Sequence, residues 1–147
     1  MLQEEEPIAI HEQFDKLLQE NNPASIRDFL NDQNISDVVE LVDEYPEYNT
    51  AIMSNMAIHR AVSVFKNLDI SDQRRLVKEL HPFKTAELLN ELSPDDRTDF
   101  FEELPKEALR GLIKLLNPEE RKITLSLLGY PEDSVGRLMT PDYVYVH

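Results

Sequence analysis

Leucine recurs at an unbroken spacing of twelve residues, and this periodicity limits what the chain can fold into. The six positions are Leu68, Leu80, Leu92, Leu104, Leu116 and Leu128. The same phase continues back to Met56, and after a slip of two residues it resumes at Val42, Leu30 and Leu18. Self-similarity at a short fixed period is typical of repeat proteins, which build extended binding surfaces from stacked units. The spacing therefore favours a binding protein over an enzyme with a closed pocket.

Each repeat begins with signals of a helix start. The sequences SPDD (93–96) and NPEE (117–120) place a capping side chain, a proline at the first helical position and acids in the first turn. Asp69 or Ser71 can cap the helix that follows Leu68. Apolar residues at the ninth and twelfth positions, and at the eighth in most repeats, form the stripe of an amphipathic helix. A repeat of this length leaves a helix of roughly nine residues, about 14 Å long.

The pattern predicts an all-α fold, a solenoid of about ten short helices over residues 1–128. The helices are expected near 8–20, after Asn22, after Asn34, around 46–53, over 57–67, and in five further repeats to Leu128. Short turns favour antiparallel neighbours, and packing must hold helices too short to be stable alone. Beyond Leu128, the sequence GYP (129–131) ends the last helix and YVYV (143–146) is β-prone. Residues 129–147 are therefore predicted to be a linker and the truncated start of another domain.

Composition excludes several functions. The net charge of −14 repels a phosphate backbone, so nucleic acid is not an expected partner. The chain has no cysteine, which excludes disulfides and thiolate chemistry. No signal peptide and no apolar run of the ~18 residues needed to cross a bilayer are present, so this piece is not expected to insert into a membrane. Neither a nucleophile motif nor a glycine-rich phosphate loop is present, so no catalytic activity and no small-molecule substrate are expected.

Carboxylates gather on two consecutive predicted helices. Asp95, Asp99 and Glu102 or Glu103 follow one another at i, i+4 and i+7 or i+8, so they share one helix face. The helix before it repeats the i, i+4 pairing. The full set is Glu87, Glu91, Asp95, Asp96, Asp99, Glu102 and Glu103. Like charges at this spacing destabilise a helix, so their accumulation invites a cation.

Two interpretations of these acids remain open. Asp95 and Asp96 lie in a first turn, where the helix dipole favours acids without any metal, and exposed acids are common. If a cation binds, hard oxygen ligands favour Mg²⁺ or Ca²⁺. The EF-hand pattern is absent, and Mg²⁺ needs only one or two protein carboxylates because it keeps several of its waters. The four histidines show no metal-ligand spacing.

The sequence resembles the cytosolic N-terminal domain of MgtE-type magnesium transporters. The similarity lies in LHP (80–82), AELL (86–89) and LSPDD (92–96), and above all in YPEDSVGRLMTPDYV (130–144), and it covers nearly the whole chain. The short repeats alone are also similar to those of flagellar motor switch proteins of the FliG type. The tail is more specific, since in the MgtE family it leads into paired CBS domains.

The resemblance implies a right-handed superhelix of short helices attached to CBS domains and a membrane pore, as a homodimer at the cytoplasmic face of the cell membrane. In that family, Mg²⁺ bound between the acidic N domain and the CBS domains favours the closed pore. By the match of SPDDRTD (93–99), the implied magnesium ligands are Asp95 and Asp99. A further acidic position of some members is Ser63 in this chain, for which Glu87 or Glu91 could substitute.

The sequence therefore predicts a regulatory Mg²⁺-sensing domain of a magnesium transporter. The main alternative is a metal-independent helical-repeat scaffold of the flagellar motor switch type, which would bind another protein through charged helical faces. A Mg²⁺-dependent phosphoryl hydrolase is a third hypothesis. It would require carboxylates that converge in a pocket.

Overall fold

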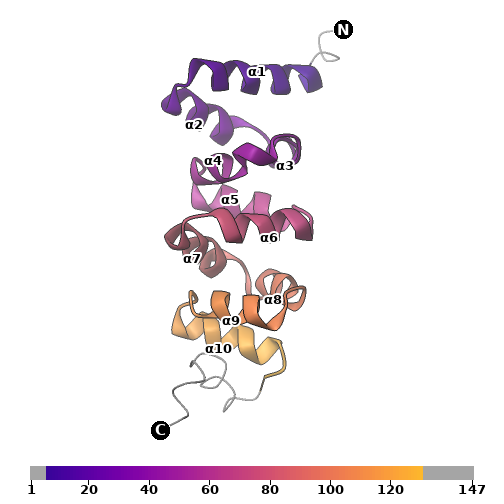
Figure 1. Ribbon diagram of the computed structural model, residues 1–147, viewed down its shortest axis with the longest axis vertical. Helices are drawn as coiled ribbons and strands as arrows, with labels where there is room; N and C mark the ends of the chain where they lie inside the picture. Colours follow the sequence, from indigo (N-terminus) through magenta and orange to yellow (C-terminus); the bar gives the residue numbers. More distant parts are fainter. Residues whose placement is uncertain (1–5, 131–147) are drawn as a thin grey trace. The chain divides into compact units, whose positions relative to one another are not determined.

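The computed structural model describes residues 6–130, and most of this part of the chain is helical. The first helices are α1 (Glu6–Glu20), α2 (Pro23–Asp32), α3 (Ile35–Glu44), the 3₁₀ helix η2 (Pro46–Tyr48), α4 (Asn49–Ser54) and α5 (Ile58–Lys66). They are followed by α6 (Ile70–Glu79), α7 (Pro82–Glu91), α8 (Pro94–Glu102), α9 (Lys106–Ile113) and α10 (Pro118–Leu127). The predicted all-α class and the ten α-helices are confirmed for these residues (Figure 1).

The chain divides into two compact units, residues 1–72 (unit 1) and 73–147 (unit 2), with the boundary in the first turn of α6. Within unit 1, α1 packs against α2, and α3 packs against α5. Within unit 2, α8 packs against α10. The right-handed superhelix and the domain boundary near residue 128 stay predictions, and residues 131–147 lie outside the described part of the chain.

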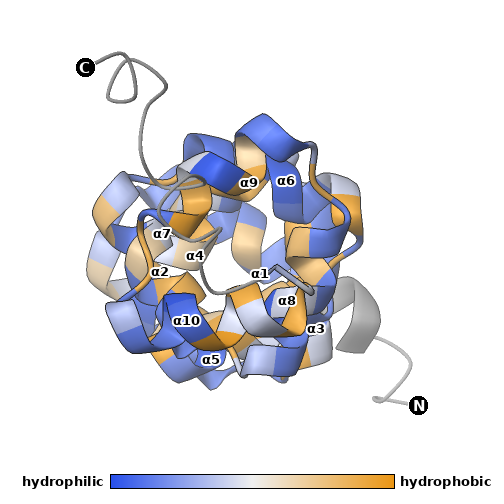
Figure 2. Ribbon diagram, turned by 90° about the horizontal axis from the view of Figure 1, so that it is seen from below, coloured by the Kyte–Doolittle hydropathy of each residue, from blue (hydrophilic) through white to orange (hydrophobic). Residues whose placement is uncertain are grey.

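Each unit buries the apolar stripe that the periodicity predicts. Most residues of the twelve-residue ladder are buried, as are most residues at the ninth position of each repeat. Orange hydrophobic and blue hydrophilic patches both occur on the helices that Figure 2 shows. Leu104 and Leu128 are half-buried. Short amphipathic helices thus gain their stability from packing, as expected for elements too short to persist alone.

The two units repeat the same internal arrangement. Helices α2 and α7 each span ten residues and begin with proline at the first position. Near the end of α2, the side chain of Asn31 donates to the carbonyl oxygens of Arg27 (2.8 Å) and Asn55 (3.0 Å) and accepts from the amide of Ala57 (3.0 Å). This bracket fixes the loop before α5 to the end of α2.

Asn90 near the end of α7 makes the corresponding bracket in unit 2. Its side chain donates to the carbonyl oxygens of Ala86 (2.7 Å) and Leu115 (3.0 Å), and its Oδ1 accepts from the amide of Asn117 (2.7 Å). Asn31 and Asn90 stand 59 residues apart, at equivalent positions of helices of equal length. The chain therefore contains a repeat of five helices above its repeat of twelve residues.

Two of the three predicted helix caps are confirmed. The Ser93 side chain accepts from the amide of Asp96 (3.2 Å), and Asp69 accepts from the amide of Asp72 (2.9 Å). The prediction that Asn117 caps α10 through its side chain is wrong, because its side chain makes no cap hydrogen bond. The Asn117 amide is instead bound by Asn90, and proline with two acids in the first turn suits the N-terminus of α10 without a side-chain cap.

Candidate functional site

The predicted acidic face lies on α7 and α8 of unit 2. Six of its seven carboxylates are exposed, and Asp96 is half-buried; the exposed ones are Glu87, Glu91, Asp95, Asp99, Glu102 and Glu103. Asp95 and Asp99 lie one turn apart on α8, as the i, i+4 spacing requires. Proline at the first position and the Ser93 cap begin α8 directly before Asp95. The helix start thus places both acids on a solvent-facing surface.

A lysine already neutralises part of this surface. Lys84 Nζ lies 3.5 Å from Glu87 Oε1 across one turn of α7, and both side chains are partly exposed. An ion pair of this kind contributes little to stability, because water and salt screen it. It does lower the charge that Glu87 offers to a cation. Among the predicted ligands, Asp95 and Asp99 therefore have the stronger case, because they lie in no ion pair that the structure records.

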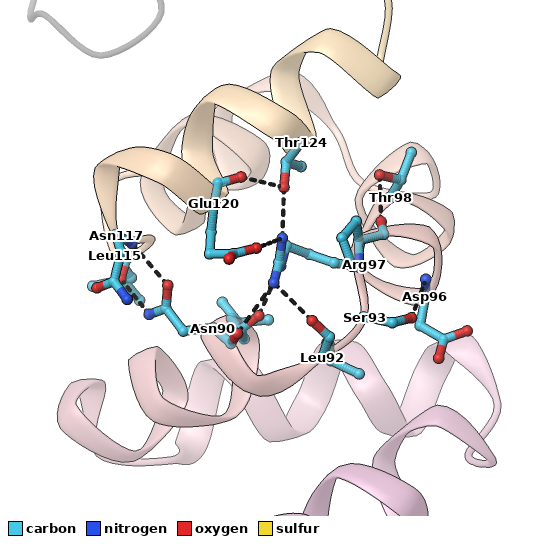
Figure 3. A network of polar contacts seen from close by, with 12 residues as sticks. Asn90, Leu92, Ser93, Asp96, Arg97, Thr98, Leu115, Asn117, Glu120 and Thr124 are labelled. Carbon is cyan, nitrogen blue, oxygen red and sulfur yellow. Dashed lines mark hydrogen bonds and ion pairs between the residues drawn. The ribbon is translucent and has the colours of Figure 1, made fainter.

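A buried arginine stands between these two acids in the sequence. Arg97 is fully buried, and its guanidinium contacts α7 and α10 (Figure 3). Its Nη1 lies 3.0 Å from Glu120 Oε1, an ion pair whose carboxylate side chain is 30% exposed. Arg97 was not among the residues that the sequence predicted for the site. Its signal was the pattern of α8 itself, where the inward position between Asp95 and Asp99 holds a charged residue instead of an apolar one.

A second acidic group, which the sequence did not predict, lies in unit 1. Carboxylate oxygens of Asp43, Asp69 and Asp72 all lie within 4.8 Å of one another. Asp43 and Asp69 are exposed, whereas Asp72 is buried. Among the described residues this is the one group of three or more potential ligands that converges in this way, and it includes none of the seven predicted acids. Three converging carboxylates suit a hard divalent cation.

The comparisons with known proteins agree with the resemblance seen in the sequence. The family model described as MgtE intracellular N domain matches residues 33–133. The chain belongs to this family. The magnesium transporter MgtE of Thermus thermophilus is 33% identical over 146 residues, which cover 97% of this chain and 32% of that protein. The magnesium transporter MgtE of Bacillus subtilis is 24% identical over 131 residues, covering 88% and 29%.

A solved structure shares the fold of this MgtE intracellular N domain. It is a crystal structure of the cytosolic domain of the Mg²⁺ channel MgtE in complex with ATP, which superposes with a TM-score of 0.73 at 28% sequence identity. The match covers 81% of this chain and 50% of that chain. The chain spans about a third of the length of the curated relatives it matches. Within the described residues, no helix combines the length and apolar content that a bilayer span requires.

The position of Ser63 in this MgtE intracellular N domain offers no carboxylate. Ser63 is half-buried on α5, and its hydroxyl donates to the carbonyl oxygen of His59 at 3.2 Å. A hydroxyl already bound to the helix backbone is a poor ligand for Mg²⁺, which prefers carboxylates and water. Ser63 is therefore not a candidate ligand, and the predicted ligands lie on α7 and α8 alone.

A half-buried tyrosine joins α1 to the end of α3 in the same domain. The Tyr45 hydroxyl donates to Asp15 Oδ1 at 2.8 Å, and its ring packs edge-on against Phe14 with centroids 5.0 Å apart. Nearby, His11 Nε2 lies 3.3 Å from Glu40 Oε2. Burial first, and then the hydrogen bond to Asp15, raises the pKa of Tyr45 from 10.0 to about 12. Tyr45 is therefore a neutral structural donor at physiological pH.

Proposed function

We propose that this chain is the Mg²⁺-sensing regulatory domain of a magnesium transporter, at the cytoplasmic face of the cell membrane. The observation that carries the proposal is the pair Asp95 and Asp99, which are exposed on one face of α8 in a domain of the MgtE intracellular N family. The strongly negative net charge of −14 supports a role in which cations hold acidic surfaces together.

The donor set fits a hard divalent ion. Asp95 and Asp99 would supply carboxylate oxygens from α8, and the exposed Glu87 and Glu91 of α7 would supply further ones. Exposed carboxylates with no cysteine favour Mg²⁺ over softer metals. When bound, Mg²⁺ supplies the positive charge that opposes repulsion between acidic surfaces. Asp96, Glu102 and Glu103 extend the negative field of this face without being needed as ligands.

The proposed partners are the other parts of the same transporter. Because the chain spans about a third of its curated relatives, we propose that residues 129–147 lead into CBS domains and a membrane pore, in a homodimer. The acidic face would dock onto the CBS domains and favour the closed pore. Two helices alone would provide an incomplete cation site, and the second surface would complete it.

The energetics follow from linkage. An ion that binds the docked state and not the separated state stabilises docking by RT ln(1 + [L]/Kd). At a hundredfold excess over Kd this is about 2.7 kcal/mol for one site, enough to shift a two-state balance by roughly a hundredfold. As Mg²⁺ falls, repulsion between the acidic faces separates them and the pore opens more easily.

Small-angle scattering of the transporter's whole cytosolic part, titrated with Mg²⁺, tests this function. The radius of gyration should fall as Mg²⁺ rises and should not fall with monovalent salt of equal ionic strength. In Asp95→Ala with Asp99→Ala the transition should weaken. A matched control is Asp28→Ala with Glu107→Ala, which removes the same charge from exposed positions of α2 and α9 and should leave the transition unchanged.

The outcome also separates the alternatives. An unchanged radius, or the same change with salt alone, would refute the Mg²⁺ sensor and favour the metal-independent scaffold. A response weakened equally by both double variants would show that net charge, and not the α8 face, governs docking.

A further inference from the structure

Arg97 faces the interior of unit 2 at the point where α8 carries its two proposed ligands. It lies two positions after Asp95 and two before Asp99, is 0% exposed, and both acids are exposed. Because successive helical residues turn by about 100°, residues two positions apart point to nearly opposite sides of a helix. An inward Arg97 therefore corresponds to outward Asp95 and Asp99.

The guanidinium is bonded through all of its N–H groups. Its Nε donates to the carbonyl oxygen of Leu89 (2.8 Å), and its Nη2 donates to those of Leu92 (2.7 Å) and Asn90 (3.2 Å). These three carbonyls lie at the C-terminal end of α7, which has no N–H partners of its own for them. Arg97 thus ties α8 to the end of the helix that carries Glu87 and Glu91.

The remaining nitrogen of the guanidinium, Nη1, contacts α10. Arg97 Nη1 donates to Thr124 Oγ1 at 2.9 Å and pairs with Glu120 Oε1 at 3.0 Å (Figure 3). Five donors in a rigid plane meet five acceptors on two other helices, an arrangement that lysine cannot reproduce. The orientation of α8 about its own axis is consequently set from two directions.

Apolar packing alone would fix α8 only at its C-terminal half. The buried residues of α8 are Arg97, Thr98, Phe100 and Phe101. The two phenylalanines anchor the second half of the helix, whereas the first half, next to Asp95, buries only polar side chains. Thr98 bonds within the helix, to the carbonyl oxygen of Pro94 at 2.7 Å. Arg97 is therefore the inward anchor of the half that presents the acids.

In unit 1 the equivalent helix α3 packs without a buried arginine. Four positions after the N-cap of α3, where unit 2 has Arg97, stands the buried Val38. Arg60 of α5 instead donates through Nη2 to the carbonyl oxygens of Leu30 (3.0 Å) and Gln33 at the end of α2. The carbonyl oxygens at the end of α2 thus accept hydrogen bonds from an arginine of α5, and α3 has no charged residue on its buried face.

The exchange involves three equivalent positions. Arg60 and Glu120 both stand three residues after the N-cap of their helix, and Val64 and Thr124 both stand seven after it. Unit 1 thus has Val38, Arg60 and Val64 where unit 2 has Arg97, Glu120 and Thr124. All but Arg60 and Glu120 are buried. In unit 2 the arginine therefore lies on α8, the helix with the exposed acids, and Glu120 and Thr124 of α10 accept its hydrogen bonds.

We propose that Arg97 is a positioning residue, which holds the first half of α8 so that Asp95 and Asp99 face outward together for a divalent cation. The cation part rests on the proposed function above; the positioning part does not. Arg97 itself binds no ion in this scheme. It acts through the orientation of the helix, as outer-sphere residues orient the ligands of metal sites.

Nuclear magnetic resonance of this chain tests both parts separately. Residual dipolar couplings of the α8 amides report the helix orientation without any cation. A Mg²⁺ titration of the Asp95 and Asp99 amide shifts in the transporter's whole cytosolic part, at constant ionic strength, reports binding with the second surface present. In Arg97→Met the couplings of the first half of α8 should change, and the Mg²⁺ concentration at half-maximal shift should rise roughly tenfold, the lower end of effects seen for outer-sphere partners.

Rescue and control variants separate positioning from stability. A triple variant recreates the unit 1 arrangement: Arg97→Val, Glu120→Arg and Thr124→Val. It should restore both the couplings and the Mg²⁺ concentration at half-maximal shift (the half-point). Ile113→Ala loosens the buried core of unit 2 at α9, so it should lower the melting temperature but leave the half-point unchanged. If Arg97→Met does not fold by circular dichroism, Arg97→Lys and the triple variant provide the same comparison.

Unchanged couplings in a folded Arg97→Met variant would overturn the positioning role. So would a half-point that moves as far in Ile113→Ala as in Arg97→Met, because loss of stability would then explain both. Changed couplings, with no Mg²⁺ shift of these amides in the unaltered cytosolic part of the transporter, would support positioning and would refute Asp95 and Asp99 as cation ligands.

Discussion

The Asn90 bracket allows a sharp test of how unit 2 is held together. Asn90→Ala removes the donor to the Leu115 carbonyl (3.0 Å) and the acceptor of the Asn117 amide (2.7 Å). Both bonds connect the end of α7 to the loop before α10. The third bond, to the Ala86 carbonyl, stays within α7 and matters less, because that carbonyl already has a helical partner.

The expected loss follows from these two bonds. Each hydrogen bond contributes about 1 kcal/mol net, so their removal costs about 2 kcal/mol. Alanine is the better helix former by about 0.5 kcal/mol, which leaves a destabilisation of about 1.5 kcal/mol. For a cooperative unit of 60–100 residues this corresponds to a fall in melting temperature of about 6–12 °C.

Calorimetry or circular dichroism melting of the chain measures this fall, with two matched variants. Asn31→Ala removes the equivalent bracket of unit 1 and should cost a similar amount. Asn67→Ala removes a side-chain bond to the Ser63 carbonyl that stays at the end of α5, and should change stability by less than about 0.5 kcal/mol. A loss in Asn90→Ala no larger than in Asn67→Ala would show that the bracket does not hold the loop.

Two further predictions concern unit 1. Because the folded-state pKa of Tyr45, about 12, exceeds the ordinary value of 10.0, its neutral hydroxyl contributes stability that is complete below pH 10 and is lost as the pH rises through about 12. Melting temperatures should fall across this window in the unaltered chain and less in Tyr45→Phe; equal slopes would contradict the assignment. Asp69→Ala should cost about 1 kcal/mol by removing the cap of α6. Asp69→Asn keeps the cap and removes one charge beside Asp43 and Asp72, so it should be at least as stable as the unaltered chain in urea unfolding, and a loss equal to that of Asp69→Ala would refute the repulsion.

The helices could be predicted because their signals are local. Proline at the first position and an apolar stripe behind it define α2, α7, α8 and α10 within a few residues, and a capping side chain precedes the proline in all of these but α10. The five-helix repeat was also present in the sequence, but a slip of two residues between Val42 and Met56 hides it from a search at a spacing of twelve. Comparison of the chain with itself at an offset near 59 would have aligned Asn31 with Asn90.

The candidate site was less predictable, because what converges depends on contacts between distant segments. Spacing placed Asp95 and Asp99 on one face of α8 but could not bring Asp43 next to Asp69 and Asp72, since the end of α3 meets the start of α6 only in the fold. Nor could composition distinguish Arg97 from the exposed arginines, because burial of a charged residue depends on its acceptors being in place.

Those acceptors suggest why the arrangement of unit 2 is held so firmly. Removing Arg97 alone would leave Glu120 and the α7 carbonyls without their donor, so a single loss is costly and the residues must change together. Unit 1 has different residues at all three equivalent positions, Val38, Arg60 and Val64, and is folded. Within one chain the same five-helix unit therefore exists with a buried arginine, Arg97 on α8, and with a buried valine, Val38 on α3, at the equivalent position. The anchor is found on α8, whose exposed face carries Asp95 and Asp99, whereas the equivalent positions of α3 are Ser36 and Glu40, of which Glu40 pairs with His11. Packing alone therefore does not require an arginine at this position, and in unit 2 it is Arg97, with Glu120 and Thr124 as its acceptors, that holds α8 where its two acids are exposed.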